Sequence, residues 1–397
     1  MKLVANPLFV PLWEIHAVTL VAAHVLFFAL NKATSIPGSV LGLAAAALQL
    51  TLPLLVDTTP GFPLLIVTVM FMSMLSALRL MDVATVPSAT SKAWSFPEYV
   101  EYCLTLDTKP MRDYRQAQLV KRASQATGGR TARRFLERQV PPEKRNAVYY
   151  ANLTMWIAAQ WIAYNICIYY MEFGPFERNP PLMQPFNFAR ISLKNLADVL
   201  APTLTICIVL NLSYVFCFHA IVELFRIPYN PMMDNPFISS SFRDFWSVRW
   251  NMLVKQTLHR LTFEPTMKFL SLFSGPRNRD SSKDVRPPAW HAAVAAFNAF
   301  IFSGLMHEWL IFALMDIPTT GEQMVFFLIH GVVTVGQVVV VLGIPRKWKL
   351  RSAIDNMPLP VAMLITDILM IWFAPFFLNP YVRSEFLTKI SRLPTVF

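Results

Sequence analysis

The chain has 397 residues, of which 55% are hydrophobic and only 15% are charged. Soluble proteins carry about 25% charged residues, so this composition indicates a protein whose body lies in a lipid bilayer. The formal net charge of +11 could indicate a nucleic-acid partner, but the chain has no compact basic arm and no aromatic platform. Its Lys and Arg residues lie instead between apolar stretches. We therefore expect no nucleic-acid partner.

Apolar stretches long enough to cross a bilayer recur along the whole chain. Each is close to the roughly 20 residues that cross the hydrocarbon core as a helix. The eight predicted spans are Leu8–Leu30, Pro37–Val56, Phe62–Met81, Val148–Met171, Val199–Phe225, Trp290–Met315, Gln323–Leu342 and Pro360–Leu378. The sequence therefore predicts an all-α, polytopic membrane protein, with about eight transmembrane helices in a single membrane-embedded domain, residues 1–397.

The distribution of basic residues predicts how these spans are oriented. The loops that follow the first, third, fifth and seventh spans carry 27 of the 35 Lys and Arg residues. Cytoplasmic loops carry the excess of positive charge in membrane proteins. We therefore expect the basic loop 82–147 and the loop 226–289 to face the cytosol, and both termini to face the lumen.

The cysteines predict neither a metal centre nor a disulfide framework. They show no CxxC spacing, and three of them lie in apolar runs, where cysteine packs as a small hydrophobic residue. The four are Cys103, Cys167, Cys207 and Cys217.

The segment 235–268, NPFISSSFRDFWSVRWNMLVKQTLHRLTFEPTMK, has an unusual composition. It is too charged for a lipid-facing span and too aromatic for a solvated loop. Ser241 followed by Asp244 forms a capping-box pattern that should begin a helix. We therefore predict a signature helix within the protein near the cytosolic face, with its aromatic side chains buried. An amphipathic helix in the membrane interface is the alternative.

The predicted span 290–315 contains adjacent ionisable residues, His307 and Glu308, in an apolar helix. Ionisable groups inside a span are costly and are candidates for function. Ser303 and Gly304 share the face of His307, and we expect their small side chains to leave space for a substrate beside the imidazole. Glu308 points about 100° away and is expected to pair with a buried base or hydroxyl.

Together, two motifs resemble a known family. The pattern NPF-x-S-x-SFRDFW-xx-RWN at 235–251 is followed about 50 residues later by FSGLMHE at 302–308. This pair resembles the two signatures of the membrane-bound O-acyltransferase superfamily in its wax-synthase-like branch. The resemblance implies that His307 is the catalytic histidine and that Asn251 is the second polar residue of the site. It also implies acyl-CoA as co-substrate, no permanently bound cofactor, and the endoplasmic reticulum membrane.

Those roles predict a mechanism. A neutral imidazole suits a general base, so His307 is expected to remove the proton of an alcohol, which then attacks the thioester. The Asn251 amide is the candidate donor to the carbonyl oxygen as it gains charge. The phosphates of coenzyme A need a basic cytosolic mouth. The residues predicted to bind coenzyme A are Arg249, which lies inside the signature, together with Arg243, Lys255, Arg260 and Trp246.

Three functions are compatible with the sequence. Fungal members of the branch, which the chain resembles in its size and its long basic loop, often acetylate terpenoid or polyketide secondary metabolites, and we favour this function. Plant-like members esterify fatty alcohols with long acyl chains, as wax synthases. A transporter with a buried His and Asp proton relay is the alternative of another class, but it gives no reason for the motif RDFW-xx-RWN. The other polar residues within spans could line a tunnel, but we favour hydrogen-bonded packing inside the protein. They are Glu14, His16, His24, His219 with Glu223, His330 and Asp367.

Overall fold

A computed structural model describes residues 12–55, 63–105, 117, 120, 140, 142–224, 226, 231–273, 288–315, 320–343 and 348–387. The chain divides into two compact units, which are described separately. Unit 1 comprises Met1–Asn165, Cys207–Met232 and Ile390–Phe397, and unit 2 comprises Ile166–Ile206 and Met233–Lys389.

Each of the eight predicted spans overlaps a long helix. These helices are α1 (Leu12–Ala33), α2 (Gly38–Leu55), α3 (Pro63–Ala84), α8 (Ala147–Phe173), α9 (Leu193–Leu224), α13 (Ala289–Met315), α14 (Glu322–Gly343) and α16 (Leu359–Arg383). A helix satisfies its backbone hydrogen bonds internally, as an apolar environment requires. Within the described residues, four stretches are long and apolar enough to cross a membrane: Leu193–Phe216, Ala289–Ala313, Glu322–Val339 and Leu359–Arg383. The integral membrane character is supported, whereas the number of eight spans stays a prediction.

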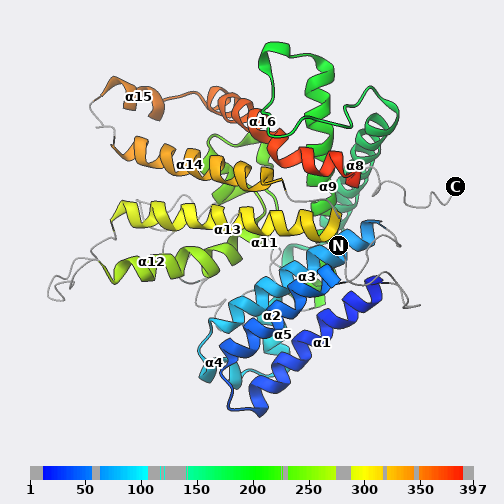
Figure 1. Cartoon of the computed structure of the whole chain (residues 1–397), viewed down its shortest axis with the longest axis vertical. Helices are drawn as coiled ribbons and strands as arrows, with labels where there is room; N and C mark the ends of the chain where they lie inside the picture. The colour runs from blue at the N-terminus through cyan, green and yellow to red at the C-terminus, as the bar shows by residue number, and fades with distance from the viewer. Residues whose placement is uncertain are drawn as a thin grey trace. The chain divides into compact units, whose positions relative to one another are not determined.

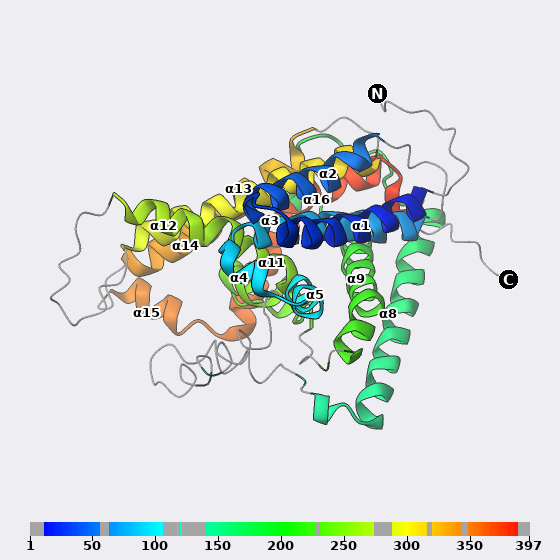
Figure 2. The same ribbon diagram turned by 90° about the horizontal axis from the view of Figure 1, so that it is seen from below.

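Unit 1 is built around α1, α2 and α3, which lie side by side (Figures 1 and 2). A Cβ atom on Gly42 of α2 would lie 2.8 Å from the carbonyl oxygen of Leu80 on α3, so glycine allows the two backbones to approach closely. Two short helices, α4 (Ser88–Ala93) and α5 (Phe96–Thr105), follow α3. They form the first part of the predicted basic loop 82–147, half of which lies outside the described residues.

Two polar residues of unit 1 behave as packing residues. The ring nitrogens of His24 lie 2.7 Å from the hydroxyl of Tyr99 and 2.8 Å from the hydroxyl of Ser76. His219 Nδ1 lies 3.8 Å from the carboxylate of Glu223. The prediction that His24 is hydrogen-bonded inside the protein is confirmed, whereas His219 and Glu223 have closer partners, the hydroxyl of Tyr149 at 3.2 Å and the guanidinium of Arg145 at 3.1 Å.

Unit 2 is built around α13 and α14, which a short connection folds back on each other. Figures 1 and 2 show α12 (Glu264–Ser271) along α13 and α16 along α14. Glycine again permits the close approach. A Cβ on Gly304 would lie 2.9 Å from the sulfur of Met324, and a Cβ on Gly331 would lie 2.9 Å from the ring of Phe297. The expectation that Gly304 leaves space for a substrate is therefore wrong, because Met324 occupies that space.

The predicted signature helix 235–268 is broken into short pieces. A turn at Pro236–Ile238 precedes α10 (Phe242–Asp244), which continues as the π-helical turn η4 (Phe245–Arg249). After an interruption at 250–251, the chain forms α11 (Met252–Leu258), the π-helical turn η5 (His259–Phe263) and α12. π-Helical turns occur frequently at functional sites. The predicted start is confirmed, because Ser241 caps α10, but the single continuous helix is wrong.

Candidate active site

The signature motif 235–251 forms a closed loop. Its first and last residues, Asn235 (φ 42°) and Asn251 (φ 33°), both adopt the left-handed conformation, which asparagine tolerates better than most residues. The backbone N–H of Asp234 donates to the carbonyl of Arg249 at 2.8 Å and closes the loop at its base. Two sharp changes of chain direction therefore delimit the motif, and they explain why a continuous helix does not form there.

The first turn of α10 is held by side chains at its N-terminus. The hydroxyl of Ser241 accepts a hydrogen bond from the N–H of Asp244 at 3.0 Å, and the carboxylate of Asp244 accepts one from the N–H of Ser240 at 3.2 Å. Such caps satisfy the N–H groups that a helix leaves without partners at its start. This turn fixes Asp244 at the position where Arg249 meets it.

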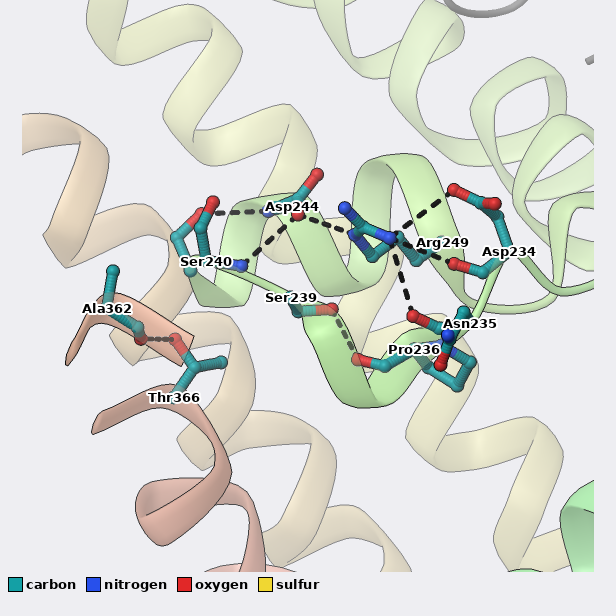
Figure 3. A network of polar contacts seen from close by, with 10 residues as sticks. Asp234, Asn235, Pro236, Ser239, Ser240, Asp244, Arg249, Ala362 and Thr366 are labelled. Atoms are coloured by element: carbon teal, nitrogen blue, oxygen red, sulfur yellow. Dashed lines mark hydrogen bonds and ion pairs between the residues drawn. The ribbon is translucent and has the colours of Figure 1, made fainter. Parts of the chain in front are cut away.

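Arg249 joins the two ends of the loop, as Figure 3 shows. Its Nε donates to the carboxylate of Asp244 at 2.6 Å. Its Nη1 lies 3.1 Å from the carbonyl oxygen of Asp234, 3.4 Å from the carboxylate of the same residue and 3.4 Å from the carbonyl oxygen of Asn235. The side chain is only 8% exposed. These contacts give Arg249 a structural role inside the loop, while its predicted contact with coenzyme A stays a prediction.

Asn251 caps the next helix. Its Oδ1 accepts a hydrogen bond from the N–H of Val254 at 3.2 Å, at the start of α11. Because the oxygen of the amide is engaged in this way, the Nδ2 group is the part of the side chain that can donate elsewhere. A fixed amide with a donating nitrogen is the arrangement that the predicted role requires.

His307 lies on α13 among aromatic side chains of unit 2. Its ring stacks on Phe327 of α14, with centroids 4.7 Å apart and planes 25° apart, and it meets Phe377 of α16 edge to face at 5.2 Å. The imidazole is half-buried. Its Nδ1 is buried and has no hydrogen-bond partner within the part of the chain that the structure describes. The two aromatic rings therefore hold the orientation of the imidazole, and no hydrogen bond to Nδ1 from the described residues fixes its tautomer.

Trp246 connects the signature loop to this aromatic group. Its ring centroid lies 5.7 Å from Phe327, which also contacts His307, and 5.6 Å from His330 on α14. It also contacts Phe300 of α13 at 5.6 Å. Trp246 was predicted to bind coenzyme A; the structure places it against the residues that surround His307.

The neighbour of His307, Glu308, binds the start of the next helix. Its carboxylate accepts a hydrogen bond of 3.0 Å from the backbone N–H of Met324, in the first turn of α14. Acidic groups are stabilising at helix N-termini. Glu308 therefore ties α13 to α14 one residue from the imidazole, and its carboxylate also interacts electrostatically with the buried hydroxyl of Tyr381 on α16.

The remaining basic residues of the predicted coenzyme A mouth differ in exposure. Arg243 is exposed, whereas Lys255 and Arg260 are half-buried. Burial lowers the pKa of Lys255 below its usual value, because an apolar environment disfavours the charged form. Of these residues, Arg243 is the one that meets solvent most fully. Within the described residues, no group of three or more His, Cys, Asp and Glu side chains could hold a metal ion.

Three neighbours of the site were not selected from the sequence. Phe327 and Phe377 were read only as apolar residues of spans, and His330 was assigned to internal packing. The packing contacts of His330 are present: its Nδ1 lies 2.7 Å from the carbonyl oxygen of Phe326, and its side chain is fully buried. Its Nε2, however, has no partner. A histidine within an apolar span was the only signal that could have selected it.

The comparison with known proteins identifies the class of this site. The membrane bound O-acyl transferase family model matches residues 229–329, about a quarter of the chain, and this segment contains both the signature loop and His307. The predicted resemblance is confirmed over this segment.

The similar proteins are named as O-acyltransferases. An acyl-CoA–sterol O-acyltransferase of Arabidopsis thaliana is 29% identical over 126 residues, 32% of this chain and 33% of the relative. A long-chain-alcohol O-fatty-acyltransferase of Simmondsia chinensis is 32% identical over 126 residues, 32% of each chain. A probable long-chain-alcohol O-fatty-acyltransferase of Arabidopsis thaliana is 32% identical over 130 residues, 33% of this chain and 35% of the relative. The chain thus matches about a third of the length of these relatives.

Proposed function

We propose that the protein is an acyl-CoA-dependent O-acyltransferase that esterifies a hydroxyl group of a lipophilic acceptor within a membrane. The match of residues 229–329 supports this function most directly, because it joins the signature loop and His307 in one segment. The relatives that match this segment are named as acyltransferases that act on sterols or long-chain alcohols.

In the proposed mechanism, His307 removes the proton of the acceptor hydroxyl. The alcohol oxygen then attacks the carbonyl carbon of the thioester, a C–O bond forms, and the C–S bond breaks. Coenzyme A leaves as a thiolate and takes up the proton from the imidazolium, which restores the neutral base. An imidazole suits this exchange because its ordinary pKa, about 6.5, lies near the working pH.

Asn251 is proposed to stabilise the oxygen of the tetrahedral intermediate through Nδ2. The hydrogen bond from Val254 to its Oδ1 fixes the direction of the amide before the substrate arrives. A donor that is oriented in advance is worth more than one that must reorganise during the reaction.

The phosphates of coenzyme A are proposed to bind on the cytosolic side, at Arg243, Lys255 and Arg260. Of these residues, Arg243 is exposed and therefore the most accessible. Arg249 supports this surface by closing the loop, since its guanidinium is bound to Asp244 and Asp234. The proposed location is the endoplasmic reticulum membrane, with both termini in the lumen.

Two candidate reactions differ in the acyl donor. The size of the chain and its long basic loop favour acetylation of a terpenoid or polyketide secondary metabolite, with acetyl-CoA as donor. The second candidate is a wax synthase that joins a long-chain acyl group to a fatty alcohol, and the names of the relatives from Simmondsia chinensis and Arabidopsis thaliana favour it.

Release of free coenzyme A by purified membranes tests the proposal. Acetyl-CoA and palmitoyl-CoA are each supplied with a panel of terpenoid, sterol and fatty alcohols, and membranes that carry the His307→Ala variant serve as the matched control. We expect release that depends on both the acceptor and His307. No release above the control with any pair would contradict the proposed activity, and the preferred donor separates the two candidates.

A further inference from the structure

Two buried nitrogen atoms, on the contacting rings of Trp246 and His330, lack hydrogen-bond partners among the described residues, and they have complementary chemistry. The indole Nε1–H of Trp246 is a donor, and it is buried without an acceptor within the described part of the chain. His330 Nε2 is likewise buried and unpartnered there. Buried polar groups are nearly always hydrogen-bonded, so each of these atoms needs an explanation.

The hydrogen bond on the other side of the ring determines the state of His330. Its Nδ1 lies 2.7 Å from the carbonyl oxygen of Phe326, which can only accept, so Nδ1 carries the hydrogen. In the neutral ring, Nε2 is then an acceptor, through its lone pair. The site therefore presents one donor, from Trp246, and one acceptor, from His330, and the two rings meet nearly edge to face with centroids 5.6 Å apart.

A hydroxyl group satisfies both atoms at once. It accepts from the indole N–H through its oxygen and donates its own hydrogen to Nε2. Two hydrogen bonds of about 2.9 Å to one oxygen span nitrogens up to roughly 5.8 Å apart, so the proposal requires Trp246 Nε1 and His330 Nε2 to lie within that distance of each other. A carbonyl or ether oxygen would satisfy Trp246 alone, and an ammonium group would satisfy His330 alone.

Trp246 of this pair and His307 both contact the same aromatic side chain. Phe327 contacts Trp246 at 5.7 Å and His307 at 4.7 Å, so one aromatic side chain touches both the base and the unpartnered pair. Along the same face of α14, four and seven residues beyond His330, Thr334 Oγ1 and Gln337 Oε1 are also buried without partners among the described residues. A hydrophilic line thus runs along a helix that is apolar enough to cross a membrane.

We propose that Trp246 and His330 bind a hydroxyl group of the acceptor other than the one that is acylated. This inference rests on the proposed function and narrows its substrate class to lipophilic acceptors with a second hydroxyl, separated from the first by a short chain or a ring system. A simple fatty alcohol bound with its only hydroxyl at His307 leaves both nitrogens unpaired. Such a site discriminates strongly, because an acceptor without the second hydroxyl leaves buried polar groups unsatisfied.

Matched acceptors test the proposal. The series comprises a long-chain primary alcohol, diols of the same chain length with the second hydroxyl at increasing distance, and the corresponding diols methylated on the second oxygen. The methyl ether keeps the oxygen that accepts from Trp246 but loses the hydrogen that donates to His330. For the wild-type protein, we expect one diol to exceed both its methyl ether and the simple alcohol in kcat/KM by about tenfold or more, as expected for a hydrogen bond in a buried site.

Variants of His330 and Trp246 show whether these residues cause the preference for the diol. His330→Phe keeps an aromatic ring and removes the acceptor, so the ratio between diol and methyl ether should fall to about one. Trp246→Phe removes the donor, so the advantage of the diol over the simple alcohol should fall. His24→Phe is the matched control, because both ring nitrogens of His24 have partners in the protein. It is expected to lower stability while the ratios stay as in the wild type.

Binding without turnover separates this proposal from the proposed function. The preferred diol should raise the melting temperature of the purified wild-type protein more than the simple alcohol does, and His330→Phe should abolish the difference. Equal turnover and equal stabilisation with all acceptors would mean that a water molecule occupies the pair, and would overturn the proposal. A His330→Phe variant that keeps the preference would also overturn it. Stabilisation by the diol without coenzyme A release from any acceptor would contradict the proposed activity alone.

Discussion

Replacement of Arg249 by alanine should destabilise the protein rather than weaken acyl-CoA binding selectively. The guanidinium is 8% exposed and bridges two carboxylates, those of Asp244 at 2.6 Å and Asp234 at 3.4 Å. Its loss removes the guanidinium from two carboxylates, that of Asp234 just before the loop and that of Asp244 in α10. Breaking a buried ion pair on one side costs about 3 to 5 kcal/mol. Because the Asp244 and Asp234 side chains are 14% and 28% exposed, water can solvate them in part, and we expect about 3 kcal/mol.

The assay combines thermal unfolding of the solubilised protein with the KM values of both substrates. Arg243→Ala is the matched control, since Arg243 lies on the same loop but is exposed. It should unfold at the wild-type temperature and raise the KM for acyl-CoA. Arg249→Lys retains a charge but not the planar donor fork, so its stability should lie between the wild type and Arg249→Ala. A stable Arg249→Ala variant with a selectively raised KM for acyl-CoA would show that Arg249 binds phosphate.

Three further outcomes are expected. Gly304→Val should reduce the yield of folded protein, with an overpacking cost of about 1 to 3 kcal/mol, because a Cβ there lies 2.9 Å from Met324 Sδ and 3.2 Å from its Cα; a wild-type melting temperature would contradict the close packing of α13 and α14. Glu308→Ala should lose about 1 kcal/mol, as a lost helix cap does, while Glu308→Gln retains an acceptor for the Met324 N–H and should unfold near the wild type. Equal stability of the two variants would argue against the cap. Single cysteines introduced into the loops 82–147 and 226–289 should react with an impermeant reagent in sealed microsomes, and labelling only after permeabilisation would reverse the predicted orientation.

Features that depend on local sequence were predicted well. The long apolar stretches coincide with helices, because a segment in lipid must satisfy its own backbone hydrogen bonds. Ser241 caps α10 as the capping pattern predicted, since the cap involves residues three positions apart. The two motifs identified the class of the site, and the family match over 229–329 confirms it.

Features that depend on tertiary contacts were missed. The break at Asn251 requires a left-handed residue, and the loop it closes is held by Arg249 and Asp234, which are fifteen positions apart. Gly304 lies against Met324, from the next helix, so its small size serves helix packing. The contact between Trp246 and His330 joins residues from distant segments. Composition and periodicity carry no information about such pairs.

The role of His307 is the central claim, and turnover per correctly folded molecule tests it most directly. His307→Ala removes the base, and His307→Gln keeps a polar side chain that cannot accept the proton at neutral pH. Both variants should accumulate as folded protein, because the imidazole Nδ1 makes no hydrogen bond within the described residues. Both should lose at least about 100-fold to 10,000-fold in rate, the contribution typical of a general base. Near-normal turnover in either variant would contradict the assignment of His307 as the catalytic base.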